Sequence, residues 1–528
     1  MDHKDNDAHS IDSIRRRRFL GGTAATAAAA LTWGVSPGYA TGSGSHSQPL
    51  QTTANRLRRN INAPDFPAQV INTYALAVQR LLALPPEDPR NWYRIALTHL
   101  LDCPHANWWF LPWHRGYIGW FERICREITQ THDFALPYWD WTAFPNMPQQ
   151  FFQGVLDPAN RAFFQSLNDF ERVMRAPLQA SWNRLTTKQR TLLELRGYAS
   201  FAQLWADATK PQTLLLGPRR LNASNPGLPS NARKLTSVQS LRAALGPRDF
   251  ASFGSARTTQ HSIMGEFGAL EVSHNIVHDS VGGLMGDFMS PCDPIFWLHH
   301  ANIDRIWEEW MLLQHAEGLP ELPSSSAFTV WNAEPYEFFV DALGHPVTGY
   351  DSRRYAQAST FEYSYQGGTS TGLRAPLTGY SNQRYTGQMI SADCTVEKPA
   401  TGNVSVPAPL LSQLAAGDAS PVMISITLNS PRDPTEWYFD VLLDADGSNV
   451  REQQIGRFKA FGSHQHTNDH GSGDFSFVLP LGPAVQARYG AGELDVGRPL
   501  SFKITMQPVR SGIPPVTVTC SHISVKMS

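Results

Sequence analysis

Apolar residues recur at helical spacing from about Leu57 to Tyr365, with aromatic-rich loops between the amphipathic segments. After Pro112, for example, apolar residues that include Ile118 and Phe121 fall on one helical face. The pattern predicts a mainly helical region, which we place at residues 41–366.

A different pattern begins at Gly367. The segment 367–408 is rich in Gly, Ser, Thr and Pro and predicts a linker. Four short β-rich runs then follow between turn residues: Val422–Leu428, Trp437–Leu443, Phe475–Leu479 and Val516–Lys526. They predict a small antiparallel β-sandwich over residues 409–528.

The first 40 residues have the order of an export signal. Four consecutive arginines, Arg15 to Arg18, precede Phe19-Leu20, an Ala- and Thr-rich stretch and a small-residue cleavage site that ends at Ala40. This order predicts a bacterial twin-arginine signal over 1–40 and a periplasmic or secreted protein. No run reaches the ~18 apolar residues of a membrane helix, so we expect no membrane anchor.

Composition narrows the function classes. The 528 residues contain 44 Lys and Arg against 46 Asp and Glu, a formal net charge of −2, so the chain lacks the basic excess of a nucleic-acid binder. With 41% hydrophobic and 17% charged residues it is expected to fold. The 5 Cys are too few for a disulfide scaffold, and their odd number leaves at least one without a cysteine partner.

Two histidine clusters carry the candidate chemistry. The first contains His99, Cys103 and His105, followed by His114, which is predicted in the first turn of the helix after Pro112 and on its buried side. The second contains His274 and His278, whose four-residue spacing places both rings on one helical face, and then the adjacent pair His299 and His300.

Several buried histidines that converge without a partner would be costly, and a metal ion would accept their lone pairs. Imidazole ligands suit copper, zinc or iron, and the His-Glu-x-x-His motif of zinc hydrolases is absent from the sequence. Two sets of three histidines therefore suggest a pair of copper ions.

The sequence resembles the type-3 copper proteins, namely the tyrosinases, catechol oxidases and haemocyanins. The motifs are Cys103-Pro104-His105, Trp113-His114-Arg115, Pro137-Tyr138-Trp139-Asp140-Trp141, His274-Asn275-Ile276-Val277-His278 and the run from Asp293 to Arg305. Arg58-Arg59-Asn60 looks like the opening segment of the family, and Tyr363-Ser364-Tyr365 like its closing tyrosine motif. Tyr438-Phe439-Asp440-Val441 looks like the C-terminal-domain signature of plant-type polyphenol oxidases, with Tyr in place of Lys.

The resemblance implies an antiparallel four-helix bundle that holds two copper ions. Its ligands would be His99, His105 and His114 for the first copper, and His274, His278 and His300 for the second. His299 would lie one layer further out. The six-residue step from His99 to His105 is shorter than is usual in the family, but the next candidate upstream, His46, lies outside the domain.

Cys103 matches the cysteine that some members of the family join to the histidine through a thioether bond. The bond would stiffen His105 and would account for one sulfur of the odd set. An ordinary buried thiol is the alternative.

Four further residues carry implied roles around the metals. Glu271, three residues before His274, and Asn275 resemble the pair that holds a basic water in monophenol-active tyrosinases, although Glu271 could instead anchor a helix or loop. Phe288 or Met289 matches the bulky residue that plant enzymes place over the first copper, and Phe288 could equally be plain core.

The implied activity is the oxidation of phenols by O2: o-hydroxylation of monophenols and oxidation of o-diphenols to o-quinones. A catechol or o-aminophenol oxidase without monophenolase activity is the alternative enzyme, and a haemocyanin-like oxygen carrier is the alternative from another class. The C-terminal domain resembles one that plugs the copper site in latent proenzymes. His464, His466 and His470 lie in a polar loop of that domain, where transient copper binding and plain solvation are both open.

Overall fold

The structure, a computed structural model, describes residues 56–210, 219, 221–260, 262–374, 383–417, 422–431, 434–443, 452–461 and 473–527. These residues belong to one compact unit, Thr53–Ser528. The predicted signal peptide 1–40 lies outside the described residues, as do His46, His464, His466 and His470. Within the described ranges, no helix is both long and apolar enough to span a bilayer.

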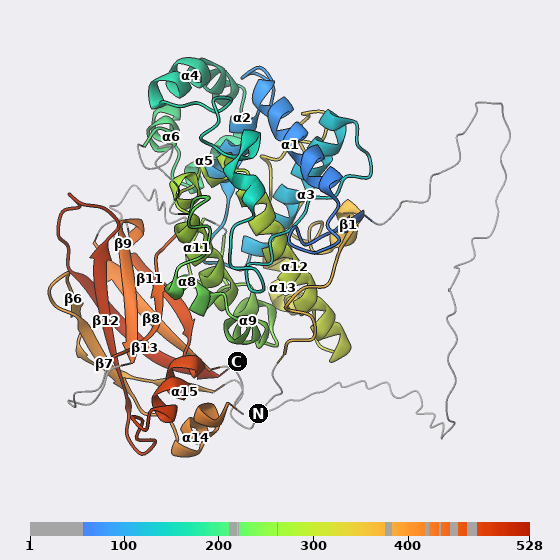
Figure 1. Cartoon of the computed structure of the whole chain (residues 1–528). Coiled ribbons are helices and arrows are strands. Elements are labelled where there is room, and N and C mark those ends of the chain that lie inside the picture. Colours follow the sequence, from blue (N-terminus) through green and yellow to red (C-terminus); the bar gives the residue numbers. More distant parts are fainter. Residues whose placement is uncertain are drawn as a thin grey trace, which may run out of the picture. The chain divides into compact units, whose positions relative to one another are not determined.

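Four helices carry five of the six predicted metal-ligand histidines (Figure 1): α2 (Trp92–Asp102), α3 (Phe110–Thr129), α11 (Ala269–Val281) and α12 (Ile295–Ala316). They form a helical core around the histidine cluster, while their arrangement as an antiparallel four-helix bundle stays a prediction. The other helices are α1 (Ala68–Ala83), α4 (Leu167–Asn183), α5 (Thr187–Leu195), α6 (Phe201–Ala208), α8 (Ser230–Leu235), α9 (Val238–Leu245), α10 (Phe250–Phe253), α13 (Ser325–Asn332), α14 (Ala408–Ala416) and α15 (Gly482–Gly490).

Local sequence explains where the first two of these four helices begin. The Asn91 side chain caps α2 by accepting a hydrogen bond from the amide of Tyr93. Helix α3 begins at Phe110, so Pro112 lies in its first turn, where a helix does not use the amide hydrogen. His114 therefore lies in the second turn, not in the first turn that was predicted.

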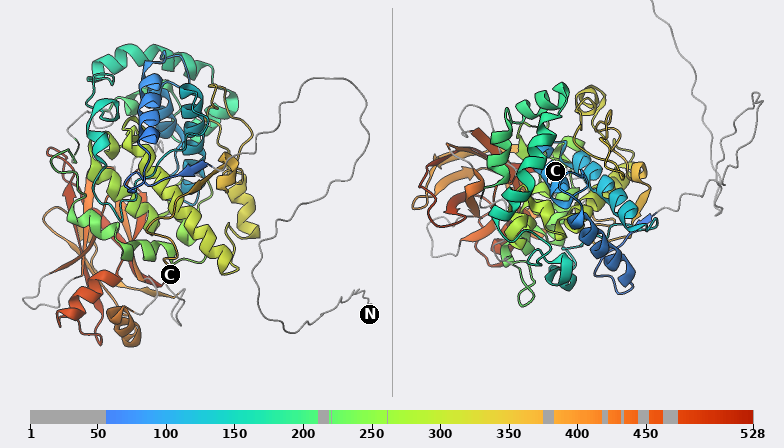
Figure 2. Two further views of the ribbon diagram at one scale, coloured as in Figure 1. Left: turned by 45° about the vertical axis from the view of Figure 1, so that its right-hand side comes forward. Right: turned by 90° about the horizontal axis from the view of Figure 1, so that it is seen from above.

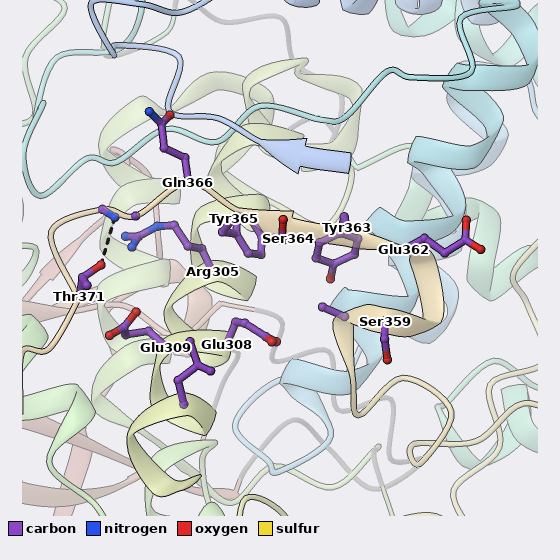
Figure 3. Close-up of a pocket in the computed structure, with 14 residues that line it drawn as sticks. Arg305, Glu308, Glu309, Ser359, Glu362, Tyr363, Ser364, Tyr365, Gln366 and Thr371 are labelled. Atoms are coloured by element: carbon purple, nitrogen blue, oxygen red, sulfur yellow. Dashed lines mark hydrogen bonds between the residues drawn. The ribbon is translucent and has the colours of Figure 1, made fainter. Parts of the chain in front are cut away.

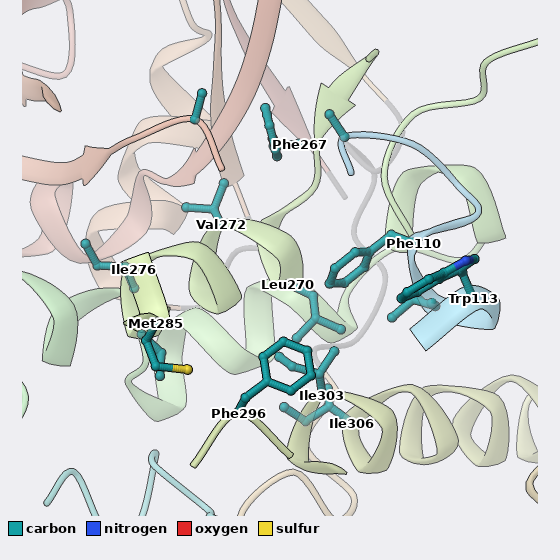
Figure 4. Close-up of a cluster of buried hydrophobic side chains, with 14 of the residues drawn as sticks. Phe110, Trp113, Phe267, Leu270, Val272, Ile276, Met285, Phe296, Ile303 and Ile306 are labelled. Carbon is teal, nitrogen blue, oxygen red and sulfur yellow. The ribbon is translucent and has the colours of Figure 1, made fainter. Parts of the chain in front are cut away.

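Apolar side chains of these helices pack together in a buried cluster (Figure 4). Figure 4 labels Phe110 and Trp113 from α3, Leu270, Val272 and Ile276 from α11, and Phe296, Ile303 and Ile306 from α12. All of them are buried. This packing fixes the helices, and with them the histidines, in one arrangement.

A buried ionic network joins α3, α12 and the two ends of the helical region. The carboxylate of Asp304 on α12 accepts hydrogen bonds from Arg115 at 2.5 Å, from Tyr363 and from Tyr365, and forms an ion pair with Arg58. Burial favours a higher pKa for Asp304, but Arg115 and Arg58 outweigh it and lower this pKa. Loss of one partner would leave a buried charge uncompensated, so the network is expected to hold the helices tightly.

The opening and closing motifs of the helical region lie side by side. Strand β1 (Arg56–Arg58) pairs in parallel with β3 (Tyr363–Tyr365). The predicted boundaries of the region are therefore brought together by backbone hydrogen bonds.

The C-terminal region contains two sheets (Figure 2), shown in orange to red. One has the order β10-β9-β12-β7-β5. The other has the order β2-β11-β8-β13-β4, in which β2 is Glu266–Phe267 of the helical region, and β6 also pairs with β13. The strands are β4 (Arg384–Thr386), β5 (Gln388–Ser391), β6 (Asp393–Cys394), β7 (Ala400–Val404), β8 (Val422–Ser430), β9 (Trp437–Leu443), β10 (Gln453–Phe458), β11 (Gly473–Pro480), β12 (Leu500–Pro508) and β13 (Val518–Met527). Stacked aromatic rings such as Phe458 and Phe477 join the two sheets.

The segment 367–408 differs from the predicted linker, because strands β4 to β7 lie within it. Its Gly, Ser and Thr content indicated a loop, but pairing with β12 and β13 satisfies the backbone groups. The predicted strands 422–428, 437–443, 475–479 and 516–526 correspond to β8, β9, β11 and β13.

One strand of the six-stranded sheet comes from the helical region. Strand β2 (Glu266–Phe267) pairs in parallel with β11, and the Glu266 carboxylate accepts hydrogen bonds from Lys526 and from Ser425. The β-rich region is thus joined directly to the segment that leads into α11.

Candidate metal centre

The structure brings all six predicted ligand histidines together. His99 lies on α2, His114 on α3, His274 and His278 on α11, and His300 on α12, while His105 lies in the loop between α2 and α3. Each of these side chains is at most 3% exposed.

The three histidines predicted to bind the second copper, His274, His278 and His300 (the second set), lie closer together than the first set, His99, His105 and His114. The Nε2 atom of His300 lies 3.2 Å from Nε2 of His274 and 3.1 Å from Nε2 of His278. In the first set, Nε2 of His99 lies 3.4 Å from Nε2 of His114, and the His105 ring centroid lies 5.7 Å and 5.5 Å from the centroids of those two rings.

The two sets are neighbours. The rings of His114 and His300 stack with their centroids 4.5 Å apart, and those of His105 and His274 lie 5.7 Å apart. This adjacency allows two metal ions to act on one small molecule.

Hydrogen bonds orient the rings so that their Nε2 atoms face the cluster. The Nδ1 atoms of His99, His114 and His278 lie 2.8, 2.7 and 2.7 Å from the backbone oxygens of Phe288, Phe110 and Met285. An Nδ1–H that donates to a carbonyl leaves a lone pair on Nε2. Two such lone pairs cannot bond to each other, so Nε2 atoms that face one another fit a metal ion.

Burial also keeps the rings neutral. It lowers the pKa of His99 and of His274 to about 3, and it lowers the pKa of the other four rings well below 6.5. The Nε2 atom of His105 is buried and has no hydrogen-bond partner. A neutral nitrogen donor set of this kind fits copper.

His299 lies at the edge of the second set. Its ligand atom lies within 4.8 Å of those of His274, His278 and His300, and its Nδ1 accepts a hydrogen bond from the Trp141 indole at 3.2 Å. Its assignment to an outer layer stays a prediction.

Cys103 lies beside the His105 ring. Its Sγ atom is 3.5 Å from Nδ1 of His105. Cys103, His99 and His105 also have ligand atoms within 4.8 Å of one another. The sulfur is therefore close to the ring edge that the predicted thioether would use.

Glu271 and Asn275 lie one turn apart on α11. Asn275 Oδ1 lies 2.8 Å from Nδ1 of His274, while the Asn275 Nδ2 amide is buried without a partner. The Glu271 carboxylate accepts hydrogen bonds from the Ala106 amide at 2.7 Å and from the Ser255 hydroxyl at 2.6 Å. Burial raises the pKa of Glu271 to about 8, against the lowering effect of these two donors.

Of the two gate candidates, Phe288 has its ring beside the first set. Its centroid lies 6.0 Å from that of His99 and 6.1 Å from that of His105. Met289 is fully buried at the start of η4 (Ser290–Cys292). The role of either residue as a gate stays a prediction.

Phe461 is the site residue that the sequence analysis missed. Its ring, 3% exposed, lies 4.5 Å from the ring of His278, 5.2 Å from His105, 5.8 Å from His274 and 6.0 Å from Phe288. It follows β10 of the C-terminal region, and no local pattern distinguishes it from the other phenylalanines. The only signal was the resemblance to a domain that plugs the site.

A buried ion pair holds the Phe461 segment. Lys459 donates a hydrogen bond to Asp279, the residue after His278, at 2.8 Å. Burial favours a lower pKa for Lys459, but the Asp279 carboxylate outweighs it and raises this pKa. Charge pairing therefore fixes the segment next to the second histidine set.

A cavity of about 550 Å³ lies along α12 and the closing tyrosine motif (Figure 3). Arg305, Glu308, Glu309, Tyr363 and Tyr365 are among its lining residues, which include none of the histidines. It is separate from the metal centre.

The sequence around these histidines is similar to that of known tyrosinases. Residues 87–313 match the family model for the common central domain of tyrosinase. A tyrosinase of Hahella sp. (strain CCB-MM4) is 26% identical over 326 residues, which cover 55% of this chain and 59% of that protein. Aureusidin synthase of Antirrhinum majus is 26% identical over 289 residues, 50% of this chain and 44% of that protein. The chain thus spans about half the length of the curated relatives it matches.

Solved structures show the same fold. Latent apple tyrosinase matches with a TM-score of 0.54 at 16% identity, over 90% of this chain and 96% of that chain. Latent aurone synthase matches with a TM-score of 0.55 at 19% identity, over 90% of both chains. Residues 87–313 therefore match the common central domain of tyrosinase, and the solved structures show that the chain has the fold of these latent polyphenol oxidases.

Proposed function

We propose that the six histidines hold two copper ions and that the chain oxidises phenols with dioxygen. The observation that carries the proposal is the set of buried Nε2 atoms facing one another at 3.1–3.4 Å, with Nδ1 of three of the rings against backbone carbonyls. Two copper ions bound there would supply an electron pair to one dioxygen molecule, which can then oxidise a phenol. The match of residues 87–313 to the central domain of tyrosinase supports copper-dependent phenol oxidation.

The protein would contribute a base for the phenolic proton. We assign this role to a water bound between Glu271 and Asn275, for which the unpartnered Asn275 amide is a donor. The water would take the phenolic proton and the Glu271 carboxylate would stabilise the charge. This assignment gives o-hydroxylation of monophenols as well as oxidation of o-diphenols.

A catechol oxidase without monophenolase activity is the second candidate. It is favoured by the two protein donors that already occupy the Glu271 carboxylate, the Ala106 amide and the Ser255 hydroxyl. In this case Glu271 would only anchor the loop that carries His105.

The variant Glu271→Gln separates the two candidates. It keeps the shape of the side chain but removes the carboxylate that would stabilise the protonated water, so the kcat for a monophenol should fall at least about 100-fold while that for an o-diphenol changes severalfold at most. Oxygen-electrode rates with both substrates, at equal copper content, measure the ratio. Equal losses on the two substrates would assign Glu271 to anchoring.

We further propose the thioether between Cys103 and the His105 ring. Its formation would remove one hydrogen from the thiol and one from the ring carbon, with dioxygen as the electron acceptor. Tryptic peptide 95–115 contains both residues and should be lighter by two hydrogens and resist alkylation. A fully alkylated Cys103 in the copper-loaded chain would contradict the bond.

The contacts of Phe461 support a latent state of the intact chain. Its ring packs against the rings of His105, His278 and Phe288, so it would occupy space that a phenol needs in order to reach the histidines. We propose that the C-terminal region shields the metal centre in this way. Export through a twin-arginine signal at 1–40, and division of the chain into a catalytic and a C-terminal domain, remain proposals from the sequence.

A further inference from the structure

Ser255 is a buried polar residue whose hydroxyl bonds to the Glu271 carboxylate. It follows α10, is 2% exposed and has a backbone φ of +70°. A non-glycine residue rarely adopts this left-handed conformation, and it persists only where the surroundings enforce it. The conformation accompanies a hydroxyl directed at Glu271.

The Ser255 hydroxyl has protein partners on two sides. It donates to Glu271 Oε2 at 2.6 Å and accepts from the Gly268 amide at 2.9 Å. Gly268 packs so closely that a Cβ there would lie 3.2 Å from Ser255 Oγ. The hydroxyl is thus held at a fixed position next to the carboxylate.

Ser255 also lines a cavity of about 250 Å³ at the junction of the helical and β-rich regions. Asp249, Glu266 and Lys526 line the same cavity, which can hold several water molecules. Glu271, only 1% exposed, is not among the lining residues. Ser255 therefore stands between the buried carboxylate and a polar cavity.

We propose that Ser255 is a positioning residue that holds Glu271 and passes its proton to this cavity. The inference rests on the proposed function of Glu271. After a phenol gives its proton to the Glu271-bound water and the carboxylate becomes protonated, the Oε2–H donates to Ser255 Oγ. The bond from Oε2 to its hydrogen then breaks, a new one forms at Oγ, and the original hydroxyl proton leaves to a cavity water.

The cavity water would pass the proton on to further water. Of the carboxylates that line the cavity, Glu266 is paired with Lys526 and Ser425, and Asp249 accepts from the Ser252 amide. Ser255 Oγ can accept from both Gly268 and Glu271 while its own hydrogen points to the cavity, since a hydroxyl has one donor and two acceptor positions. Each turnover ends when the hydroxyl turns back toward the carboxylate. The relay consumes no oxidant or reductant.

The test compares Ser255→Gly with Ser252→Gly, both in a copper-loaded chain made active by Phe461→Ala. Glycine suits the positive φ at 255, so the first variant removes the hydroxyl without adding strain. Ser252 lines the same cavity but has no bond to Glu271, so its variant is the matched control. We expect Ser255→Gly to lower the monophenol kcat about tenfold or more and to leave the o-diphenol kcat within about twofold.

A double-mutant cycle distinguishes a relay from a purely structural role. In the Glu271→Gln background, Ser255→Gly should cause little further loss of monophenol rate, because the two residues act in series. Losses that multiply, or a Ser255→Gly rate equal to that of Ser252→Gly, would overturn the inference. If Glu271→Gln itself leaves the monophenol-to-diphenol ratio unchanged, the proposed base is wrong.

An infrared measurement on the copper-free intact chain gives a readout that does not depend on turnover. The carboxyl C=O stretch of protonated Glu271, identified by its loss in Glu271→Gln, should shift in Ser255→Gly and not in Ser252→Gly. An unshifted band in Ser255→Gly would show that the hydroxyl does not bond to this carboxyl group, which would contradict the inference.

Discussion

Replacing Phe461 with alanine is expected to raise the rate of o-diphenol oxidation by the intact, copper-loaded chain about ten- to hundredfold. The ring packs directly against the rings of His278 and His105, and a buried phenylalanine contributes about 1.5–3 kcal/mol to the closed state that we propose. Removing that contribution shifts the balance between closed and open states by a corresponding factor. The initial rate of quinone formation measures the effect.

Phe461→Leu is the matched control, because leucine keeps most of the apolar volume at this position. It should stay near the rate of the parent chain. Equal rates for Phe461→Ala and the parent, at equal copper content, would show that Phe461 does not limit access.

The copper-free chain is expected to lose several kcal/mol of stability on mild acidification. Burial lowers the pKa of His99 and His274 to about 3, against 6.5 for an unperturbed ring. Between these values the unfolded chain binds protons that the folded chain does not. The free energy of unfolding therefore falls as the pH drops below about 6.5, by about 1.4 kcal/mol per pH unit for each such histidine.

Other groups adjust the size of this effect. The pKa values of His105, His114, His278 and His300 are lowered in the same direction by burial. Glu271 acts oppositely, because burial raises its pKa to about 8 and the folded chain then holds a proton that the unfolded chain releases above 4.5. Between pH 4.5 and 6.5, Glu271 therefore cancels about as much of the fall in the free energy of unfolding as one histidine causes.

Urea denaturation of the copper-free chain at pH 5.5 and 4.5 should show a fall of at least about 3 kcal/mol in the free energy of unfolding. His99→Gln should make that fall smaller by about 1.4 kcal/mol. A free energy of unfolding that stays constant over this range would contradict buried, neutral histidines.

Short-range spacing made the histidine sites readable from the sequence. The four-residue step from His274 to His278 needs only one helix, and the apolar residues after Pro112 place His114 near a buried face. The β-rich runs of the C-terminal region were equally local. These features depend on periodicity, which a single sequence contains.

The contacts between distant segments could not be predicted in the same way. Phe461 reaches His278 from an element far along the chain, and Ser255 meets Glu271 through a left-handed turn that no motif marks. The strands within 367–408 also depend on partners elsewhere, in β12 and β13. Composition alone indicated a loop there, because tertiary pairing outweighs local propensity.

The most direct test of the central claim is oxygen uptake by copper-loaded Phe461→Ala, compared with the same chain carrying His278→Ala, with a monophenol and an o-diphenol side by side. We expect the Phe461→Ala chain to bind two copper ions and to take up oxygen when a phenol is present. We expect His278→Ala to abolish this uptake. Two bound copper ions with reversible oxygen binding and no phenol turnover would contradict the account and indicate an oxygen carrier.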